Sequence, residues 1–180
     1  MTQGLFATLI IGTMIQQIGL LIGGSTGNVI YLLGKAAAAL TSAGIGVGVA
    51  VKYGESPLVT VSAAVAAMVG GYAGKITGGT FFVDGNAVLA GPGEPLGAFI
   101  AAFAGITCGH LVSGKTKVDI IVTPVITIGA GSVVGLLVGP PISQMMTGLG
   151  SIINWATEQR PFIMGIVVSV VMGMVLTLPI

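Results

Sequence analysis

The chain has 180 residues, but only 6 are Lys or Arg and 5 are Asp or Glu. A soluble domain carries about 25% charged residues, whereas this chain carries 6%, which is too little to cover a surface that faces water. A net charge of +1 excludes the clustered basic face that nucleic acid requires, and the single cysteine excludes an internal disulfide and a cysteine-rich metal site. The composition therefore predicts an integral membrane protein.

Three apolar runs in the first half are predicted to span the bilayer, over residues 4–22, 29–51 and 58–74. Gln16 and Gln17 lie within the first run, and we expect at least one of them to face protein rather than lipid. The turn at residues 23–28 separates the first two runs. The second run contains Lys35 and a glycine-dense stretch at residues 44–48, which suggests a weakened or unwound helix.

Residues 75–94 form the longest segment between two spans, with the sequence KITGGTFFVDGNAVLAGPGE. Its phenylalanines and aliphatic residues favour burial, whereas its Gly-Gly, Asp-Gly and Gly-Pro-Gly pieces exclude one long helix. Irregular backbone at membrane depth is tolerated only where it is buried in protein or lines a wet cavity. The pattern therefore predicts a re-entrant loop or a short hairpin.

The second half is predicted to contain spans over residues 95–113, 118–138 and 162–180. We expect Gly139-Pro140-Pro141 to end the middle one of these. Residues 142–157 are less hydrophobic and include Trp155, so they are predicted to form an amphipathic helix at the interface. The fold class is accordingly an all-α integral membrane protein, a bundle of about five or six transmembrane helices with an irregular or re-entrant segment.

The chain contains 31 glycines, many of which recur at a spacing of four residues. Small residues at this spacing let helix backbones approach closely in lipid. The pattern therefore predicts tightly packed helix faces. The recurring glycines are Gly19/Gly23, Gly44/Gly48, Gly70/Gly74, Gly105/Gly109 and Gly131/Gly135/Gly139.

Lysine placement gives a small orientation preference, since cytoplasmic loops are enriched in Lys and Arg. With the N-terminus in the cytoplasm, Lys52, Lys115 and Lys117 fall inside, whereas Lys75 and Arg160 fall outside. We therefore expect a multi-pass protein with a cytoplasmic N-terminus.

Glu94 and the Asp84-Gly85-Asn86 stretch are the candidate binding residues of the irregular segment. Glu94 lies between prolines, and its carboxylate can accept two hydrogen bonds from sugar hydroxyls or hold a cation; the alternative is a helix-start acid at the interface. Asp84 and Asn86 fit a turn. They also fit a polar site beside an aromatic platform, which suits a sugar ring.

His110 and Lys35 are the ionisable residues predicted inside spans, where such groups are functional hypotheses by default. His110 lies about 24 Å beyond Glu94 along a helix, so the two cannot contact one small ligand. Lys35 is expected either to reach the interface or to pair with Asp84 or Glu94. Glu55 and Asp119 are expected to flank spans in solvent, and Cys108 to be a packing residue.

No catalytic constellation is present in the sequence, which has one His, one Cys and no paired acidic motif. Residues 44–48 lack the Lys-Ser/Thr pair of a phosphate-binding loop. We therefore expect no metal, no cofactor and no covalent chemistry by this chain alone.

Residues 57–180 resemble a known membrane family through three pieces: PLGAFIAAFAG at residues 95–105, Ile121-Val122-Thr123-Pro124, and Val138-Gly139-Pro140-Pro141-Ile142. These pieces, with the small-residue span that follows Arg160-Pro161-Phe162, are similar to the membrane permease component (enzyme IIC) of the bacterial sugar phosphotransferase system. The resemblance is to its fructose-type branch and to the stand-alone group that includes the perfringolysin regulator.

The resemblance implies a homodimeric permease of the bacterial inner membrane that binds a sugar, which separate phosphoryl-carrier proteins phosphorylate. The sugar contacts expected on this basis are Glu94, Asp84, Asn86, His110 and Lys35. Residues 1–180 are expected to form a single transmembrane domain, either complete or a half or truncated portion of a longer permease. Two alternatives stay open: a non-transporting membrane sensor or regulator on the same scaffold, and a small ion-coupled transporter.

Overall fold

The computed structural model describes residues 1–83, 86–87, 89, 91–157, 164–170 and 173. The chain forms two compact units, Met1–Pro140 and Pro141–Ile180. The core and all the contacts between helices discussed below belong to the first unit. The prediction of an all-α membrane protein is confirmed, with two two-residue strands as its only β-structure among the described residues.

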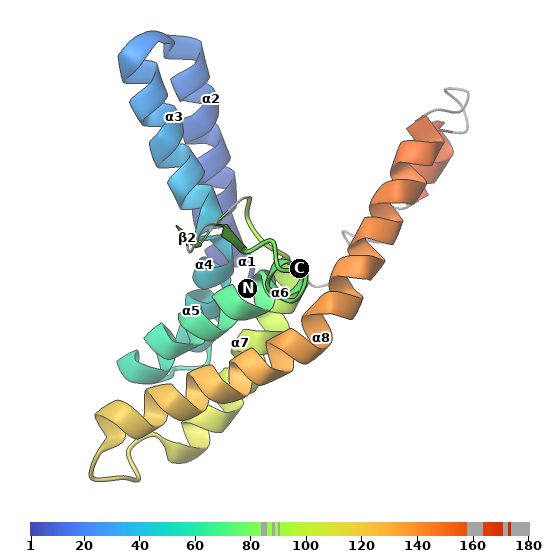
Figure 1. Cartoon of the computed structure of the whole chain (residues 1–180). Helices are drawn as coiled ribbons and strands as arrows, with labels where there is room; N and C mark the ends of the chain where they lie inside the picture. The colour runs from blue at the N-terminus through green and yellow to red at the C-terminus, as the bar shows by residue number, and fades with distance from the viewer. Residues whose placement is uncertain (84–85, 88, 90, 158–163, 171–172, 174–180) are drawn as a thin grey trace. The chain divides into compact units, whose positions relative to one another are not determined.

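The first span is one helical run, Thr2–Ile22, made of α1 (Thr2–Leu5), a π-helical segment η1 (Phe6–Ile10) and α2 (Ile11–Ile22). Gly23 and Gly24, both with positive φ, reverse the chain into α3 (Gly24–Ala39). The reversal thus takes two glycines rather than the six-residue turn predicted. α2 and α3 lie side by side as a helical hairpin (Figure 1).

Glycines bring α2 and α3 into backbone contact. A Cβ added at Gly19 would lie 2.7 Å from the carbonyl oxygen of Gly27, and one added at Gly12 would lie 2.9 Å from the amide nitrogen of Ala38. Gln16 donates from Nε2 to the carbonyl oxygen of Gly34 at 3.3 Å, so the expectation that a glutamine of this span faces protein is confirmed.

The second predicted span is broken. α3 ends at Ala39, and α4 (Thr41–Lys52) follows after Leu40 with a bend of 51°. The break was expected at the glycine-dense stretch, but residues 44–48 are helical because their glycines meet neighbouring helices: Gly44 meets α1, and a Cβ at Gly46 would lie 2.6 Å from the carbonyl oxygen of Ala63 in α5.

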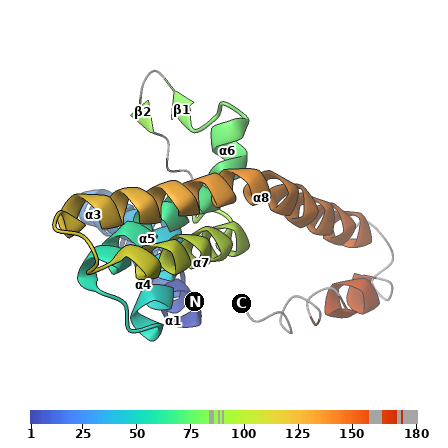
Figure 2. The same ribbon diagram turned by 90° about the horizontal axis from the view of Figure 1, so that it is seen from below.

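α5 (Pro57–Gly71) and α7 (Pro95–Val112) form the centre of the first unit with α4 (Figure 2). Ser56 caps α5 by accepting a hydrogen bond from the Val59 amide at 3.4 Å, and Pro57 takes the first helical position. The buried side chains are mostly alanines, with the larger Ile45, Val49, Val59 and Ile106 between them. Small residues allow this close packing without a large apolar core.

α8 (Asp119–Thr157) is a single helix of 39 residues. The break predicted at Gly139-Pro140-Pro141 is therefore wrong, and the predicted interfacial segment continues the same helix. Two prolines remove two backbone donors, which membrane helices tolerate without ending. Within the first unit, a Cβ at Gly131 would lie 2.6 Å from the Ala66 Cβ, and one at Gly135 would lie 2.8 Å from the Gly70 Cα. The predicted packing face is thus confirmed at Gly131 and Gly135, whereas Gly23 lies in a turn, where no described atom is within 4 Å of an added Cβ.

Three helices among the described residues are long and apolar enough to cross a membrane, and the bent α3–α4 pair makes a fourth. This is fewer than the five or six predicted. α5 has 15 residues, so it falls short of a full span. The last predicted span, at residues 162–180, lies largely outside the described residues.

The irregular segment begins with the short helix α6 (Ala73–Thr77), followed by strands β1 (Phe82–Val83) and β2 (Asn86–Ala87). The strands pair antiparallel, with Val83 opposite Asn86. The predicted short hairpin is thus confirmed. Figure 2 shows α6 and the two strands on one side of the helix layer rather than within it.

Candidate functional site

Two helix interruptions and one loop converge near the start of α7. α3 gives way to α4 at Leu40, α5 gives way to α6 at Tyr72, and the loop Gly91-Pro92-Gly93-Glu94 leads into α7. Each interruption leaves backbone carbonyls or amides without a partner inside their own helix. Such groups must find other partners when they are buried. We call this region the break junction.

Hydrogen bonds between the interruptions satisfy these groups. The Tyr72 hydroxyl contacts the carbonyl oxygen of Ala39 at 3.1 Å, at the end of α3, and also that of Gly91. The Glu94 amide donates to the carbonyl oxygen of Gly71 at 2.7 Å, at the end of α5. The Ser42 hydroxyl donates to the carbonyl oxygen of Pro92 at 3.0 Å. The loop is therefore tied to both broken helices.

The loop needs glycine for two reasons. Gly91 and Gly93 have φ values of 81° and 75°, a region that side-chain-bearing residues rarely occupy. At Gly93 a Cβ would also lie 2.6 Å from the Ser42 hydroxyl oxygen. The glycines thus let the loop approach α4 and α5 closely.

Glu94 occupies the N-cap position of α7, with extended backbone (φ −88°, ψ 110°) and Pro95 at the first helical position. It is half-buried. The start of a helix is a position where the helix dipole interacts favourably with a negative charge. The side chain makes no capping hydrogen bond to α7. Glu94 therefore places a negative charge beside the polar groups of the break junction.

A cavity of about 470 Å³ lies beside the same region, and it contains Lys35. Its other lining residues are Leu32, Ala36, Ala39, Leu40 and Leu89. Leu89 belongs to the irregular segment, so this segment reaches α3 near Lys35. Asp84 lies outside the described residues, and Asn86 is described only through its backbone pairing.

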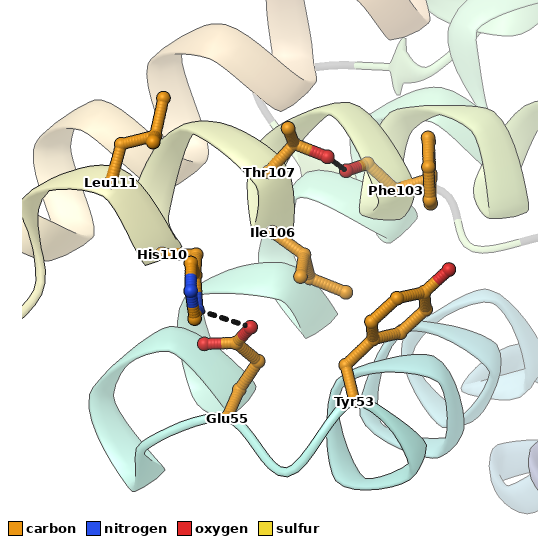
Figure 3. A pocket seen from close by; sticks show the side chains of 7 residues that line it. All are labelled: Tyr53, Glu55, Phe103, Ile106, Thr107, His110 and Leu111. Atoms are coloured by element: carbon orange, nitrogen blue, oxygen red, sulfur yellow. Dashed lines mark hydrogen bonds and ion pairs between the residues drawn. The ribbon is translucent and has the colours of Figure 1, made fainter.

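His110 lies at the opposite end of α7, in a second cavity of about 270 Å³ (Figure 3). The Nδ1 atom of His110 lies 2.9 Å from Oε1 of Glu55. The Glu55 side chain is only 6% exposed, whereas His110 is 71% exposed. The expectation that Glu55 stands in solvent is therefore wrong, because the start of α5 folds back against the end of α7. We call this the Glu55–His110 cavity.

Aromatic and aliphatic side chains form the rest of the Glu55–His110 cavity. The rings of Tyr53 and Phe103 lie 6.0 Å apart between centroids and are tilted by 59°. Figure 3 shows Ile106 between these rings and the Glu55–His110 contact. A further hydrogen bond, of 3.2 Å between the Ser56 and Ser113 hydroxyls, holds the ends of α5 and α7 together.

A family model described as "Phosphotransferase system, EIIC" matches residues 1–180, the full sequence. The chain belongs to this family. No curated protein and no solved structure matches it. The resemblance stated from the sequence is thus confirmed at the level of the EIIC family, over a longer stretch than residues 57–180. The fructose-type branch stays a prediction.

Membership makes this EIIC protein the membrane component of a sugar phosphotransferase system, with a sugar as substrate and phosphoryl-carrier proteins as partners. The apolar helices agree with a membrane location. Its candidate residues fall at two ends of α7. Glu94 and the cavity of Lys35 lie toward the break junction, and His110 lies at the other end.

Sequence reasoning missed Glu55, Tyr53 and Phe103 of this EIIC protein as site residues. One signal pointed toward the Glu55–His110 pair: the break at residues 52–57 and the end of α7 were both predicted on the cytoplasmic side. No local sequence pattern indicates that Glu55 is buried, because its burial depends on how α4, α5 and α7 pack.

Proposed function

We propose that this EIIC chain binds a sugar at the break junction and translocates it for phosphorylation by partner proteins. The convergence of two helix interruptions and the start of α7 around Glu94 carries the proposal. Transporter folds typically form substrate sites where discontinuous helices meet, because their freed backbone groups and helix ends can face a substrate. Irregular backbone of this kind is tolerated in a membrane only where it is covered by protein or lines a wet cavity.

Glu94 is the central sugar contact in this proposal. An ionised carboxylate accepts hydrogen bonds through two oxygens, and hydrogen bonds to charged groups are about twice as strong as neutral ones. The Ser42 and Tyr72 hydroxyls hold the loop that precedes Glu94, so the position of the carboxylate depends on them. This arrangement suits a neutral ligand rich in hydroxyl groups.

Lys35, Asp84 and Asn86 are proposed as further contacts on the same side. The support for this group is that Leu89, a few residues after Asn86, lines the cavity that contains Lys35. Ammonium, carboxylate and carboxamide groups together offer both donors and acceptors to sugar hydroxyls.

We further propose a bacterial inner-membrane protein that works as a homodimer, with its N-terminus in the cytoplasm. The orientation is supported by Lys52, Lys115 and Lys117, which would lie inside, against Lys75 and Arg160 outside. In this orientation the Glu55–His110 cavity opens toward the cytoplasm and the break junction lies toward the outside.

Binding of radiolabelled glucose, fructose, mannose and galactose to the purified full chain tests the proposal, together with uptake by cells that contain the phosphoryl-carrier proteins. Glu94→Gln should abolish uptake and sugar binding at the break junction while the protein still inserts and keeps its helical circular dichroism. Lys117→Gln, which removes an exposed charge after α7, is the control and should bind normally.

Unchanged sugar binding by Glu94→Gln would remove Glu94 from the site. Binding without uptake by the wild-type chain would favour a membrane sensor or regulator. Flux of an ion across proteoliposomes that follows pH and ignores sugar would favour an ion-coupled transporter. Either result would contradict sugar translocation.

A further inference from the structure

The Glu55 carboxylate in the Glu55–His110 cavity is nearly buried but only partly hydrogen-bonded. Its side chain is 6% exposed, and Oε1 pairs with His110 at 2.9 Å. Within the part of the chain that the structure describes, its Oε2 atom accepts no hydrogen bond. Oε2 is not among the buried unpartnered atoms of the described residues, so it keeps contact with the cavity opening. It is therefore available to accept a hydrogen bond from a group that enters the cavity.

The walls of the cavity are suited to one face of a sugar ring. Tyr53 and Phe103 are 60% and 44% exposed, and their tilted rings form two sides of the opening. Phe99 stacks on Phe103 at 6.2 Å and supports that ring from behind. Aromatic faces pack against apolar surface and offer no strong acceptor of their own, which complements the C–H face of a sugar.

We propose that the Glu55–His110 cavity is a second binding station for a single neutral sugar ring. The ring would lie against Tyr53 and Phe103, with one hydroxyl donating to Oε2 of Glu55 and another contacting the outward nitrogen of His110. This inference rests on the proposed function, because family membership supplies the sugar as the class of ligand.

The size and the lining of the cavity narrow the ligand further. A volume of about 270 Å³ is near the lower limit of ligand pockets, about 300 Å³, so it favours one ring over a disaccharide. Glu55 contributes the single carboxylate of the lining residues. A hard cation prefers about six oxygen ligands, which these mostly carbon walls do not offer.

The station is distinct from the break junction. Glu94 and His110 lie at opposite ends of α7, about 24 Å apart at 1.5 Å per residue. A sugar that leaves Glu94 would therefore reach the Glu55–His110 cavity only after passing most of the length of α7. The two stations would hold the substrate at the beginning and at the end of its path.

A tryptophan in the cavity wall reports on this station alone. The chain contains one tryptophan, Trp155, so Tyr53→Trp combined with Trp155→Phe keeps an aromatic wall and leaves a single reporter. Glucose, fructose, mannose and galactose are titrated separately into the full-length protein in lipid nanodiscs. At least one should change the emission saturably. Adding Glu55→Gln to this reporter variant should weaken the apparent affinity for that sugar at least tenfold.

Glu94→Gln is the matched isosteric control at the other end of α7 and should change the affinity read by the reporter less than twofold. If Glu55→Gln does not fold, His110→Gln, at a mostly exposed position, replaces it with the same expected loss. Two results would overturn the station. One is a loss of sugar affinity in Glu94→Gln as large as that in Glu55→Gln, and the other is an unchanged sugar affinity in Glu55→Gln or His110→Gln.

Wild-type uptake separates this inference from the proposed function. Uptake with no emission change for any of the four sugars would overturn the station and leave the transport proposal standing. An emission change that needs Glu55, in a chain without uptake, would support the station and contradict transport.

Discussion

Nδ1 of His110 lies 2.9 Å from Oε1 of Glu55, although the two residues are 55 positions apart in the chain. One comes from the last turn of α7, and the other from the loop before α5. The contact requires the two helices to run in opposite directions with their ends aligned. The Ser56–Ser113 hydrogen bond beside it fixes the same alignment.

The first prediction concerns the energy of this pair. Because His110 is 71% exposed, solvent screens the interaction, and we expect a coupling free energy of about 1 kcal/mol or less. A double-mutant cycle with His110→Ala and Glu55→Gln, measured by reversible unfolding in SDS, gives this coupling. Strictly additive losses in the two single variants would contradict the pair.

The second prediction concerns Tyr72, which is 1% exposed and links Ala39 to Gly91. Tyr72→Phe removes the hydroxyl, whose single proton serves the carbonyl oxygens of Ala39 and Gly91, and leaves the buried Ala39 carbonyl oxygen without this donor. We expect it to lower the free energy of unfolding by about 1–3 kcal/mol. The control is Tyr31→Phe, because the Tyr31 hydroxyl bonds to no other residue among those described. Equal effects of the two substitutions would argue against the break junction as a tied structure.

The third prediction compares the two glycines of the loop before α7. Gly91 and Gly93 both have positive φ, so alanine at either position is strained by roughly 1–2 kcal/mol. Only at Gly93 would the Cβ also meet another residue, 2.6 Å from the Ser42 hydroxyl oxygen, whereas Gly91 faces open space among the described atoms. Thermal unfolding should therefore show a larger loss for Gly93→Ala than for Gly91→Ala.

Gly148→Ala serves as the reference for that comparison. Gly148 is helical and has no described atom within 4 Å of an added Cβ, so alanine there should be neutral or slightly stabilising. A smaller loss for Gly93→Ala than for Gly91→Ala would show that the loop does not approach Ser42 as closely as described.

The fourth prediction concerns the packing of α8. A Cβ at Gly131 would lie 2.6 Å from the Ala66 Cβ and 2.7 Å from the carbonyl oxygen of Ala101, whereas no described atom lies near one at Gly129. Gly131→Val should therefore lower the free energy of unfolding by about 1–3 kcal/mol. Gly129→Val, two residues away in the same helix, should change it little. If SDS unfolding showed comparable losses of stability for Gly131→Val and Gly129→Val, the packing of α8 on α5 and α7 would be contradicted.

Local composition was enough to predict the membrane class, the packing glycines and the short hairpin. A chain with too few charges to cover a surface in water is expected to face lipid, whatever its fold. A four-residue spacing of glycines marks one helix face by geometry alone, and Gly131 and Gly135 do face α5. Gln16 needed a polar partner inside a span and found one in Gly34.

The chain breaks were predicted less well, because they depend on contacts between helices. The glycines at residues 44–48 stay helical against α1 and α5, and Pro140 and Pro141 lie within α8. The interruption at Leu40, by contrast, has no proline or glycine of its own. It is stabilised by Tyr72, a residue far away in the sequence, which contacts the carbonyl oxygen of Ala39.

The sequence by itself determined that this is a membrane protein of closely packed helices with a few isolated charges. The effects of charge content and of glycine content do not depend on how the helices are arranged. Only the tertiary structure decided which of those charges meet. Glu55 became a buried partner of His110, and Glu94 was set beside two broken helices. Burial and pairing are properties of the packed bundle, and no local spacing encodes them.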